Sequence, residues 1–291
     1  MTRRTPKPRW LSRKIPSPGL SSRVSGLLKD LSLHTVCQEA ICPNQGECFG
    51  HGTATFLLLG PNCTRNCAFC AVKKERVVPP QETEPDRIAQ AVSRMDLKFC
   101  VLTMVTRDDL PGGGAEHVAN TIFALRNRCP DVGVEVLISD FGGSETALMT
   151  VLETQPEVLN HNIETVSRLY PEVRPQADYR RSLELLARAD SYRPKLVTKS
   201  GMMLGLGETR DEVLEAMDGL RAAGCDLLTL GQYLCPSEKH HPVARYVPPE
   251  EFDELKTEAL KKGFTDVASG PYVRSSYKAE DLFKRALAAW S

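Results

Sequence analysis

The sequence lacks two features that would connect it with a membrane or with nucleic acid. Its 291 residues contain no apolar run that approaches the length needed to cross a bilayer. The 37 basic and 37 acidic residues give a formal net charge of zero, so general affinity for nucleic acid or an anionic membrane is not expected. We therefore predict neither a membrane span nor a nucleic-acid partner.

Residues 1–29 lack acidic side chains but contain eight Lys or Arg. That composition superficially suits a transit peptide, yet no apolar stretch follows, and the segment contains Pro6, Pro8, Pro16 and Pro18. We expect a basic, extended arm on the protein surface instead.

A secretory signal is also missing, so the ten cysteines favour metal binding in a cytoplasmic protein over disulfides.

Six of the cysteines form two triplets, and each triplet is one ligand short. The spacings are C-x4-C-x5-C for Cys37, Cys42 and Cys48, and C-x3-C-x2-C for Cys63, Cys67 and Cys70. A cubane iron–sulfur cluster or a tetrahedral zinc needs four ligands, so each triplet leaves a position at which something else can bind. The scattered cysteines are expected to be small buried hydrophobic residues; they are Cys100, Cys129, Cys225 and Cys235.

Two simpler interpretations of the second triplet are a zinc knuckle and a structural, ferredoxin-like cluster. Zinc would need a fourth Cys or His close by. His51 precedes the expected strand at Thr53–Leu59 rather than lying in the loop. The spacing therefore favours iron–sulfur chemistry over zinc.

Beyond residue 50 the sequence alternates strand-like and helix-like segments. The expected strands, enriched in Val, Leu, Ile and Thr like buried parallel strands, are Thr53–Leu59, Phe99–Val105, Val132–Ile138, Val158–Asn162, Lys195–Leu204 and Leu227–Gln232. The expected helices are Pro85–Met95, Ala115–Arg128, Glu145–Thr154, Arg180–Ala189, Arg210–Ala223 and Pro249–Lys261, with Gly224 and Gly263 as C-caps. Six βα units suit a partial TIM-type (β/α)6 barrel better than a doubly wound sheet, although periodicity alone does not separate the two.

Polar residues cluster where the expected strands end. Active residues of such barrels lie at the carboxyl ends of strands and in the loops that follow. There the sequence places the triplet Cys63–Cys70, the glycine-rich stretch Pro111–Gly114, Asn162 and Glu164, while Lys199 lies in the fifth strand. In a barrel, all of these residues would face one mouth.

The triplet Cys63–Cys70 resembles the cluster loop of the radical S-adenosylmethionine superfamily. It directly follows the first expected strand, and Phe69 precedes its last cysteine. The resemblance implies that the three thiolates bind three irons of a [4Fe–4S] cluster and leave the fourth iron to S-adenosylmethionine. Electron transfer to this cofactor would then generate a 5′-deoxyadenosyl radical.

The first triplet, together with the C-terminal Arg274-Ser275-Ser276-Tyr277, resembles the lipoyl synthases, and the similarity extends over nearly the whole chain. It implies a second, auxiliary [4Fe–4S] cluster held by Cys37, Cys42, Cys48 and Ser275. An oxygen ligand is harder than thiolate and binds iron more weakly, so such a cluster can open and be dismantled as a sulfur donor.

The reaction that this resemblance implies is a sulfur transfer. Sulfur would be inserted at C6 and C8 of an octanoyl chain carried on a protein lysine, with one S-adenosylmethionine consumed for each of the two radicals. The implied partners are octanoylated 2-oxoacid dehydrogenase E2 subunits and glycine cleavage H protein, a ferredoxin or flavodoxin reductant, and an iron–sulfur cluster carrier protein.

Further site residues follow from the same resemblance. Those expected to recognise S-adenosylmethionine are Gly112, Gly113, Asn162, Glu164 and Lys199. Arg274, which adjoins Ser275, is expected to help position the auxiliary cluster or its attacked sulfide. Two positions depart from the family pattern: Cys235 stands where Gln is expected, and Lys278 where His is usual.

The expected domain division has three parts: residues 1–50 form an N-terminal extension with the auxiliary-cluster cysteines, residues 51–263 form the barrel, and residues 264–291 form a C-terminal extension that supplies Ser275. Two other functions fit the sequence less well. A biotin synthase-like sulfur-inserting enzyme would lack both the first triplet and the Arg-Ser-Ser-Tyr segment. An iron–sulfur electron carrier usually saturates each cluster with cysteine and needs no barrel-sized chain.

Overall fold

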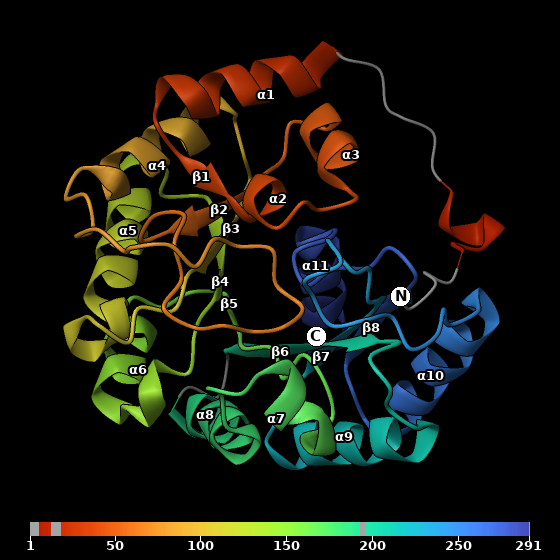
Figure 1. Ribbon diagram of the computed structural model, residues 1–291. Helices are drawn as coiled ribbons and strands as arrows, with labels where there is room; N and C mark the ends of the chain where they lie inside the picture. The colour runs from red at the N-terminus through yellow and green to blue at the C-terminus, as the bar shows by residue number, and fades with distance from the viewer. Residues whose placement is uncertain (1–5, 13–18, 193–195, 291) are drawn as a thin grey trace.

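The computed structural model describes residues 6–12, 19–192 and 196–290, and its central feature is one curved sheet (Figure 1). The strands lie in the order β1-β2-β3-β4-β5-β6-β7-β8. β1 pairs antiparallel with β2, and the later neighbours pair in parallel. The strand bounds are His34–Thr35 (β1), Thr55–Leu58 (β2), Phe99–Met104 (β3), Gly133–Leu137 (β4), Val158–Asn160 (β5), Val197–Leu204 (β6), Leu227–Gln232 (β7) and Asp266–Gly270 (β8).

The six expected strands are present as β2 to β7, so the predicted barrel-type sheet is confirmed. Their side chains are buried, at every position in β2 and β7, which explains the apolar signal in the sequence. Two further strands were not expected, because β1 has only two residues and β8 has the short, partly polar sequence DVASG. β8 continues the parallel sheet beside β7, within the segment expected to be a C-terminal extension. The three-part domain division stays a prediction.

Helices form an outer layer around the sheet (Figure 1). The six expected helices correspond to α4, α5, α6, α8, α9 and α10. Across the described ranges, no helix combines the length and apolar character needed to span a bilayer. The helix bounds are Gly19–Asp30 (α1), Val36–Glu39 (α2), Gln45–Gly50 (α3), Glu84–Arg94 (α4), Ala115–Arg128 (α5), Glu145–Leu152 (α6), Tyr170–Val173 (α7), Tyr179–Tyr192 (α8), Arg210–Ala222 (α9), Pro249–Lys261 (α10) and Ala279–Trp290 (α11), with 3-10 turns at Arg9–Leu11 (η1), Pro111–Gly114 (η2), Phe141–Gly143 (η3) and Ser167–Leu169 (η4).

Local signals fix where α9 and α10 begin and end. Gly224 and Gly263 follow these helices with φ of 74° and 94°, a conformation that glycine adopts without strain. At its start, α9 has a capping box in which Thr209 and Glu212 bond to each other's backbone amide. The expected glycines thus lie one residue beyond the C-caps, which are Ala223 in α9 and Lys262 in α10.

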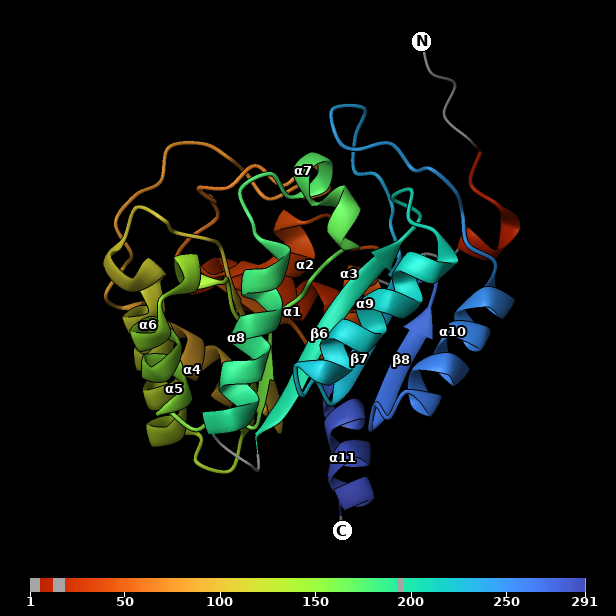
Figure 2. The same cartoon turned by 90° about the horizontal axis from the view of Figure 1, so that it is seen from below.

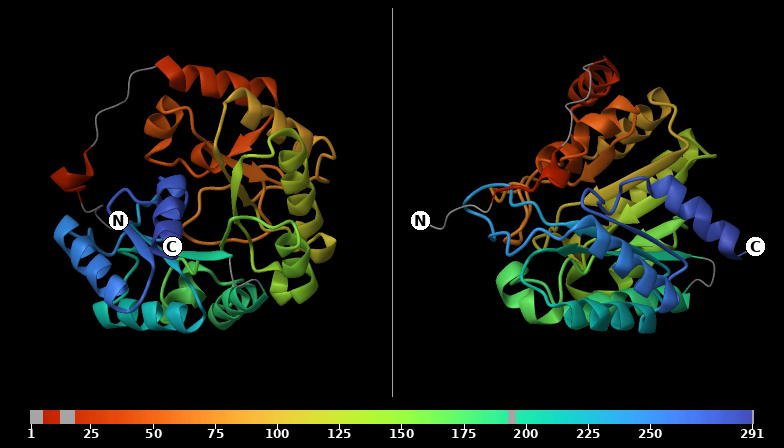
Figure 3. Two further views of the ribbon diagram at one scale, coloured as in Figure 1. Left: turned by 180° about the vertical axis from the view of Figure 1, so that it is seen from behind. Right: turned by 90° about the vertical axis from the view of Figure 1, so that its right-hand side faces the viewer.

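The expectation of an extended N-terminal arm is wrong for residues 19–29, which belong to helix α1. Val24 and Leu28, spaced one helical turn apart, are buried in the main hydrophobic cluster. Burial of these apolar side chains accounts for a helix that the basic composition did not suggest. Figure 3 shows α1 at one edge of the sheet and α10 at the other. Pro16 and Pro18 lie outside the described residues.

Helix α11 packs against the end of the barrel where the parallel strands begin (Figure 2). Leu282 and Ala286 form a buried cluster with Val158, Val197 and Leu227, which lie at the starts of β5, β6 and β7. The Phe283 ring stands 5.4 Å from the ring of Phe99 at the start of β3. This packing leaves the carboxyl ends of the strands as the end at which a site can form.

A buried ion pair joins β4 to β6 inside the barrel. The Lys199 Nζ donates to both carboxylate oxygens of Glu135 at 2.9 Å, and Asn160 Nδ2 on β5 donates to Glu135 Oε1 at 2.8 Å. Lys199 and Asn160 are fully buried, and Glu135 is 1% exposed. A carboxylate so far from water depends on these donors for its charge compensation.

We expect Lys199→Met to lower the free energy of unfolding by about 3–5 kcal/mol, because it leaves the Glu135 carboxylate buried without its cation. Urea denaturation followed by circular dichroism measures the change. The double variant Lys199→Met/Glu135→Leu should recover much of the loss, since it removes the buried charge as well. An unchanged midpoint for Lys199→Met would contradict a structural role for this pair.

Candidate active site

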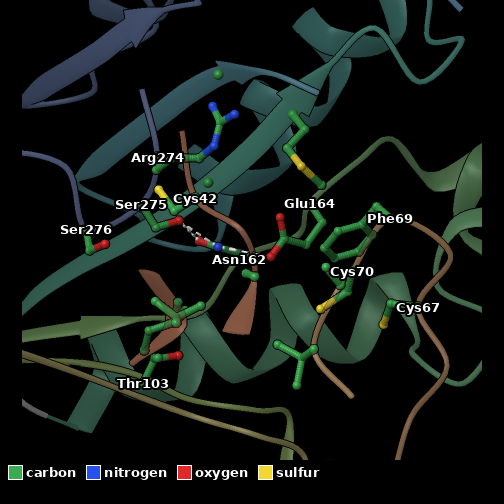
Figure 4. A pocket seen from close by; sticks show the side chains of 18 of the residues that line it. Cys42, Cys67, Phe69, Cys70, Thr103, Asn162, Glu164, Arg274, Ser275 and Ser276 are labelled. Carbon is green, nitrogen blue, oxygen red and sulfur yellow. Dashed lines mark hydrogen bonds between the residues drawn. The ribbon is translucent and has the colours of Figure 1, made fainter. Parts of the chain in front are cut away.

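A cavity of about 480 Å³ lies at the carboxyl ends of the strands, and both cysteine triplets contribute to its wall. Figure 4 shows part of this wall, with Cys42 drawn on one side of Asn162 and Cys67 and Cys70 on the other. The triplet cysteines among the lining residues are Cys37, Cys42, Cys63, Cys67 and Cys70. Two groups separated in the sequence by a strand therefore share one chamber.

The first triplet is held by two short helices. Thr35 caps α2, which carries Cys37, by accepting a hydrogen bond from the Gln38 amide at 3.3 Å. The Cys42 amide donates to the Cys37 carbonyl at 3.0 Å, which folds the intervening residues into a tight turn. Cys48 lies in α3, and the described wall of the cavity does not include it.

The second triplet lies in the loop between β2 and α4, which a guanidinium fastens to the sheet. Arg65 donates to both carboxylate oxygens of Asp108 at 2.8 and 2.9 Å and to Asp140 Oδ1 at 2.6 Å. Asp108 follows β3 and Asp140 follows β4, so the loop is tied to two strand ends. Burial alone would raise the pKa of the Asp140 carboxyl, but Arg65 lowers it to about 2.

The thiols of each triplet lie close enough to hinder one another's ionisation. Burial raises the pKa of Cys37 to about 11 and of Cys48 to about 12, and neighbouring thiols of the same triplet add to both shifts. Burial likewise raises the pKa of Cys70 to about 12, with further contributions from Cys67 and Cys63. Thiolates so placed need a positively charged partner, which an iron–sulfur cluster provides. In the described ranges, no three His, Cys, Asp or Glu side chains are grouped so as to hold a single metal ion.

Two hydrogen bonds join the first triplet to the C-terminal segment. Asn44, two residues after Cys42 in the chain, donates from Nδ2 to the Tyr272 carbonyl at 2.7 Å. The Tyr277 hydroxyl donates to Glu47 Oε1 at 2.7 Å. These contacts bracket Ser275, which lines the same cavity although it is far from the triplet in sequence.

Asn162 and Glu164 line the cavity after β5, as expected. Asn162 Nδ2 donates to Glu164 Oε1 at 3.0 Å, and Glu164 takes a positive φ of 65°. Loss of hydration raises the pKa of the Glu164 carboxyl, and the Arg174 guanidinium opposes that shift. Arg274 also lines the cavity and donates to the Val273 carbonyl at 2.6 Å.

Three residues expected to contact the cofactor are not brought to the described cavity wall. Lys199 points into the barrel and is bonded to Glu135. Gly112 and Gly113 have φ of 58° and 61° in the turn that leads into α5. A Cβ on Gly113 would stand 3.0 Å from the Phe141 ring, so this glycine serves the close packing of η2 on η3.

Sequence reasoning did not identify Arg65, Asp140 and Arg174 as site residues. Arg65 lies inside the C-x3-C spacing, and Asp140 follows the third expected strand, so the rule on strand ends could have found both. Arg174 Nη1 donates to the Asn162 and Ile163 carbonyls at 2.9 and 3.1 Å. It follows the four-residue helix α7, and no pattern in the sequence marks it.

The scattered cysteines divide into two kinds. Cys100 and Cys225 are fully buried, as expected. Cys129 is partly exposed. Cys235 is partly exposed and lines the cavity, where its thiol donates to the Ser237 carbonyl at 2.9 Å. The expectation of a buried hydrophobic residue is therefore wrong for Cys235.

Lys278, the other departure from the family pattern, has a φ of 51°, and its Nζ lies 5.5 Å from the centre of the Tyr277 ring.

Comparison with known proteins places this geometry in a family. Residues 57–220 match the model of the radical SAM superfamily. The lipoyl synthase of Acidithiobacillus ferrooxidans is 53% identical over 97% of this chain and 89% of its own length, and that of Chloroflexus aurantiacus is 55% identical over 94% and 89%. The crystal structure of methylornithine synthase shares the fold, with a TM-score of 0.53 and 13% identity over 96% of this chain and 89% of that one. The predicted resemblance is confirmed: the chain belongs to the lipoyl synthase family within the radical SAM superfamily.

Proposed function

We propose that this enzyme inserts sulfur at C6 and C8 of an octanoyl chain that is attached to a lysine of a carrier protein. Its family makes it a radical SAM sulfurtransferase with an octanoylated protein as substrate. The single observation that carries the finer proposal is that both triplets line one cavity together with Ser275. A radical formed on one side and a sulfur donor on the other would then reach the same alkyl chain.

Cys63, Cys67 and Cys70 would hold the [4Fe–4S] cluster of the superfamily. The chemistry that such a cluster supplies is one electron to S-adenosylmethionine, which yields a radical able to take hydrogen from unactivated carbon. Arg65 keeps the loop against the ends of β3 and β4, so that its thiols face the cavity. Burial raises the pKa of the Cys67 thiol, and the positive charge of Arg174 opposes that shift.

Cys37, Cys42, Cys48 and Ser275 would hold the auxiliary [4Fe–4S] cluster, whose chemistry is the supply of sulfur. The Asn44–Tyr272 and Tyr277–Glu47 hydrogen bonds support this ligand set, since they bind the segment with Ser275 to the segment with the first triplet. A serine oxygen is the weakest donor of the four, so the iron that it binds is the one most readily released. Arg274, beside Ser275 on the cavity wall, would place positive charge near this cluster.

Asn162 and Glu164 are the residues that we propose for cofactor recognition. Both line the cavity between the two triplets, and together they offer amide donors and a carboxylate acceptor for an amine or a sugar hydroxyl. Lys199, Gly112 and Gly113 are left out of this proposal. The Lys199 side chain is engaged in the ion pair with Glu135, and Gly112 and Gly113 form the turn that leads into α5.

The partners remain proposals from the family resemblance. They are 2-oxoacid dehydrogenase E2 subunits and the glycine cleavage H protein as octanoylated substrates, ferredoxin or flavodoxin as reductant, and an iron–sulfur carrier that rebuilds the auxiliary cluster. The predicted cytoplasmic location rests on the use of cysteine and likewise stays a prediction.

We expect the anaerobically reconstituted enzyme to convert an octanoyl-lysyl peptide into a dithiolated peptide when it receives dithionite and S-adenosylmethionine. Mass spectrometry of the peptide and quantification of 5′-deoxyadenosine provide the measurement, and the same peptide without the octanoyl group is the control. An electron carrier would form no 5′-deoxyadenosine. Absence of thiolated product from enzyme with both clusters verified would contradict the proposal.

Ser275→Cys should retain the auxiliary cluster and lose sulfur insertion, because a thiolate holds the fourth iron more firmly than serine does. Ser275→Ala should lower the iron content of the auxiliary site, with no effect on the cluster at Cys63–Cys70. Iron analysis and Mössbauer spectroscopy distinguish the two variants. Unchanged cluster content and product yield in both would show that serine is not a ligand.

Arg65→Lys should impair the Cys63–Cys70 site alone. Lysine cannot reach Asp108 and Asp140 at once, and hydrogen bonds to charged groups contribute about 1.5–3 kcal/mol each, so we expect a 10- to 100-fold loss of S-adenosylmethionine cleavage. The change is measured as 5′-deoxyadenosine formed per minute, together with the spectrum of the reduced cluster. Arg126→Lys, which alters an arginine–carboxylate pair away from the cavity, is the matched control. Equal activity of both variants would remove the assigned role of Arg65.

A further inference from the structure

The Ser275 hydroxyl has a partner within the protein. It lies 2.6 Å from Asn162 Nδ2 and 2.9 Å from Asn162 Oδ1, so it accepts from the amide nitrogen and donates to the amide oxygen. Figure 4 draws these contacts as dashed lines, with Glu164 on the far side of Asn162 from Ser275. Asn162 is 8% exposed and therefore has little water to bond with in place of the hydroxyl.

Two glycines make room for this contact. A Cβ on Gly201 of β6 would stand 2.8 Å from Asn162 Oδ1 and 2.9 Å from Ser275 Oγ. A Cβ on Gly231 of β7 would stand 2.1 Å from the Val273 carbonyl oxygen. Because these three distances are shorter than real Cβ contacts, a larger residue at either position would have to displace the atoms that it meets. The glycines of β6 and β7 thus allow residues 273–275 to pack directly against these strands.

The donors of Asn162 are fully used in this arrangement. A primary amide has two N–H donors, and here one bonds to Ser275 and the other to Glu164 Oε1 at 3.0 Å. A ligand that needs an Asn162 donor must therefore displace one of these two partners. Likewise, a Ser275 oxygen that has given up its proton to bind iron cannot donate to Asn162 Oδ1. The hydrogen bond that Ser275 donates to Asn162 Oδ1 and a bond from Ser275 to iron are therefore alternatives, whereas an iron-bound serine oxygen could still accept from Asn162 Nδ2.

We propose that Asn162 is a positioning residue that holds the Ser275 hydroxyl whenever this hydroxyl is not bound to iron. This inference rests on the proposed function, in which Ser275 is the fourth ligand of the auxiliary cluster. Through its amide oxygen, which keeps the Ser275 hydroxyl protonated and engaged, Asn162 would compete with iron for Ser275 and so favour release of this ligand. Because the same amide faces Glu164, a cofactor that takes its donors weakens the hold on Ser275, and the two halves of the cavity are thermodynamically coupled.

The test measures how fast the ferrous chelator ferrozine removes iron from the reconstituted auxiliary cluster. It uses the full chain with Cys63, Cys67 and Cys70 replaced by alanine, so that the iron comes from the auxiliary triplet, and it is repeated in the otherwise native chain. We expect Asn162→Ala to release iron about 2- to 10-fold more slowly than its parent, which is the range that one hydrogen bond supports. Ser275→Ala should release iron faster. A purely structural role of Asn162 would instead make both variants faster.

Two controls belong to this experiment. Tyr277→Phe removes a hydrogen bond from the same C-terminal segment without touching Asn162, and it should not slow the release of iron. Asn162→Asp keeps an acceptor for the Ser275 hydroxyl, so it should release iron at least as fast as the parent. If Asn162→Ala matches or exceeds the parent rate while Ser275→Ala is faster, the holding role is overturned and the serine ligand stands. If Ser275→Ala matches the parent, the ligand assignment fails and this inference fails with it.

A second measurement covers the case in which Asn162→Ala does not take up a cluster. In the metal-free full chain, hydrogen exchange of the amides of residues 272–277 should be about 2- to 10-fold faster in Asn162→Ala and in Ser275→Ala. The double variant should exchange no faster than either single variant, because both changes remove the same bond. Additive effects, or native exchange rates in Asn162→Ala, would overturn the proposal.

Discussion

The site depends on hydrogen bonds that join the two ends of the chain across the open side of the sheet. β1 and β8 are the edge strands, and the segments next to them meet through the Asn44–Tyr272 and Tyr277–Glu47 bonds. Asn44 is 1% exposed, so its bond forms where water does not compete. Without this closure, Ser275 and the first triplet would be separate loops at opposite edges of the barrel. With it, they become parts of one cavity wall.

The second constraint is the cost of burying charge. Burial raises the pKa of the Cys37, Cys48 and Cys70 thiols, so the two triplets are suited to a cationic cluster. Two buried cations of the barrel have carboxylate partners: Arg65 pairs with Asp108 and Asp140, and Lys199 pairs with Glu135. This pairing removes Lys199 from ligand binding and gives Arg65 a role in fixing the cluster loop. Charge neutralisation thus separates residues that serve the fold from those available to ligands.

Much of the fold could be predicted because its signals are local. β2 to β7 are apolar runs, and glycines with positive φ follow the ends of α9 and α10. β1 was not predicted because a strand of two residues shows no periodicity. β8 was not predicted because its sequence is not an apolar run, although the strand packs against α10 and α11. Helix α1 was missed because the basic composition of the first residues concealed the spacing of Val24 and Leu28.

By itself, the sequence determined the chemistry of the ligands. The spacing of cysteines within a short segment can be read without knowledge of the surrounding fold. The two incomplete triplets and the Arg-Ser-Ser-Tyr segment therefore indicated the family from the residues alone. Tertiary structure decided which side chains reach the cavity. It placed Asn162 against Ser275, turned Lys199 toward Glu135 and kept Gly112 in a packed turn. These outcomes depend on contacts between residues that are far apart in the sequence. The free energy of such contacts is set by the burial of the side chains and by their hydrogen-bond and charge partners, which a local sequence pattern does not show.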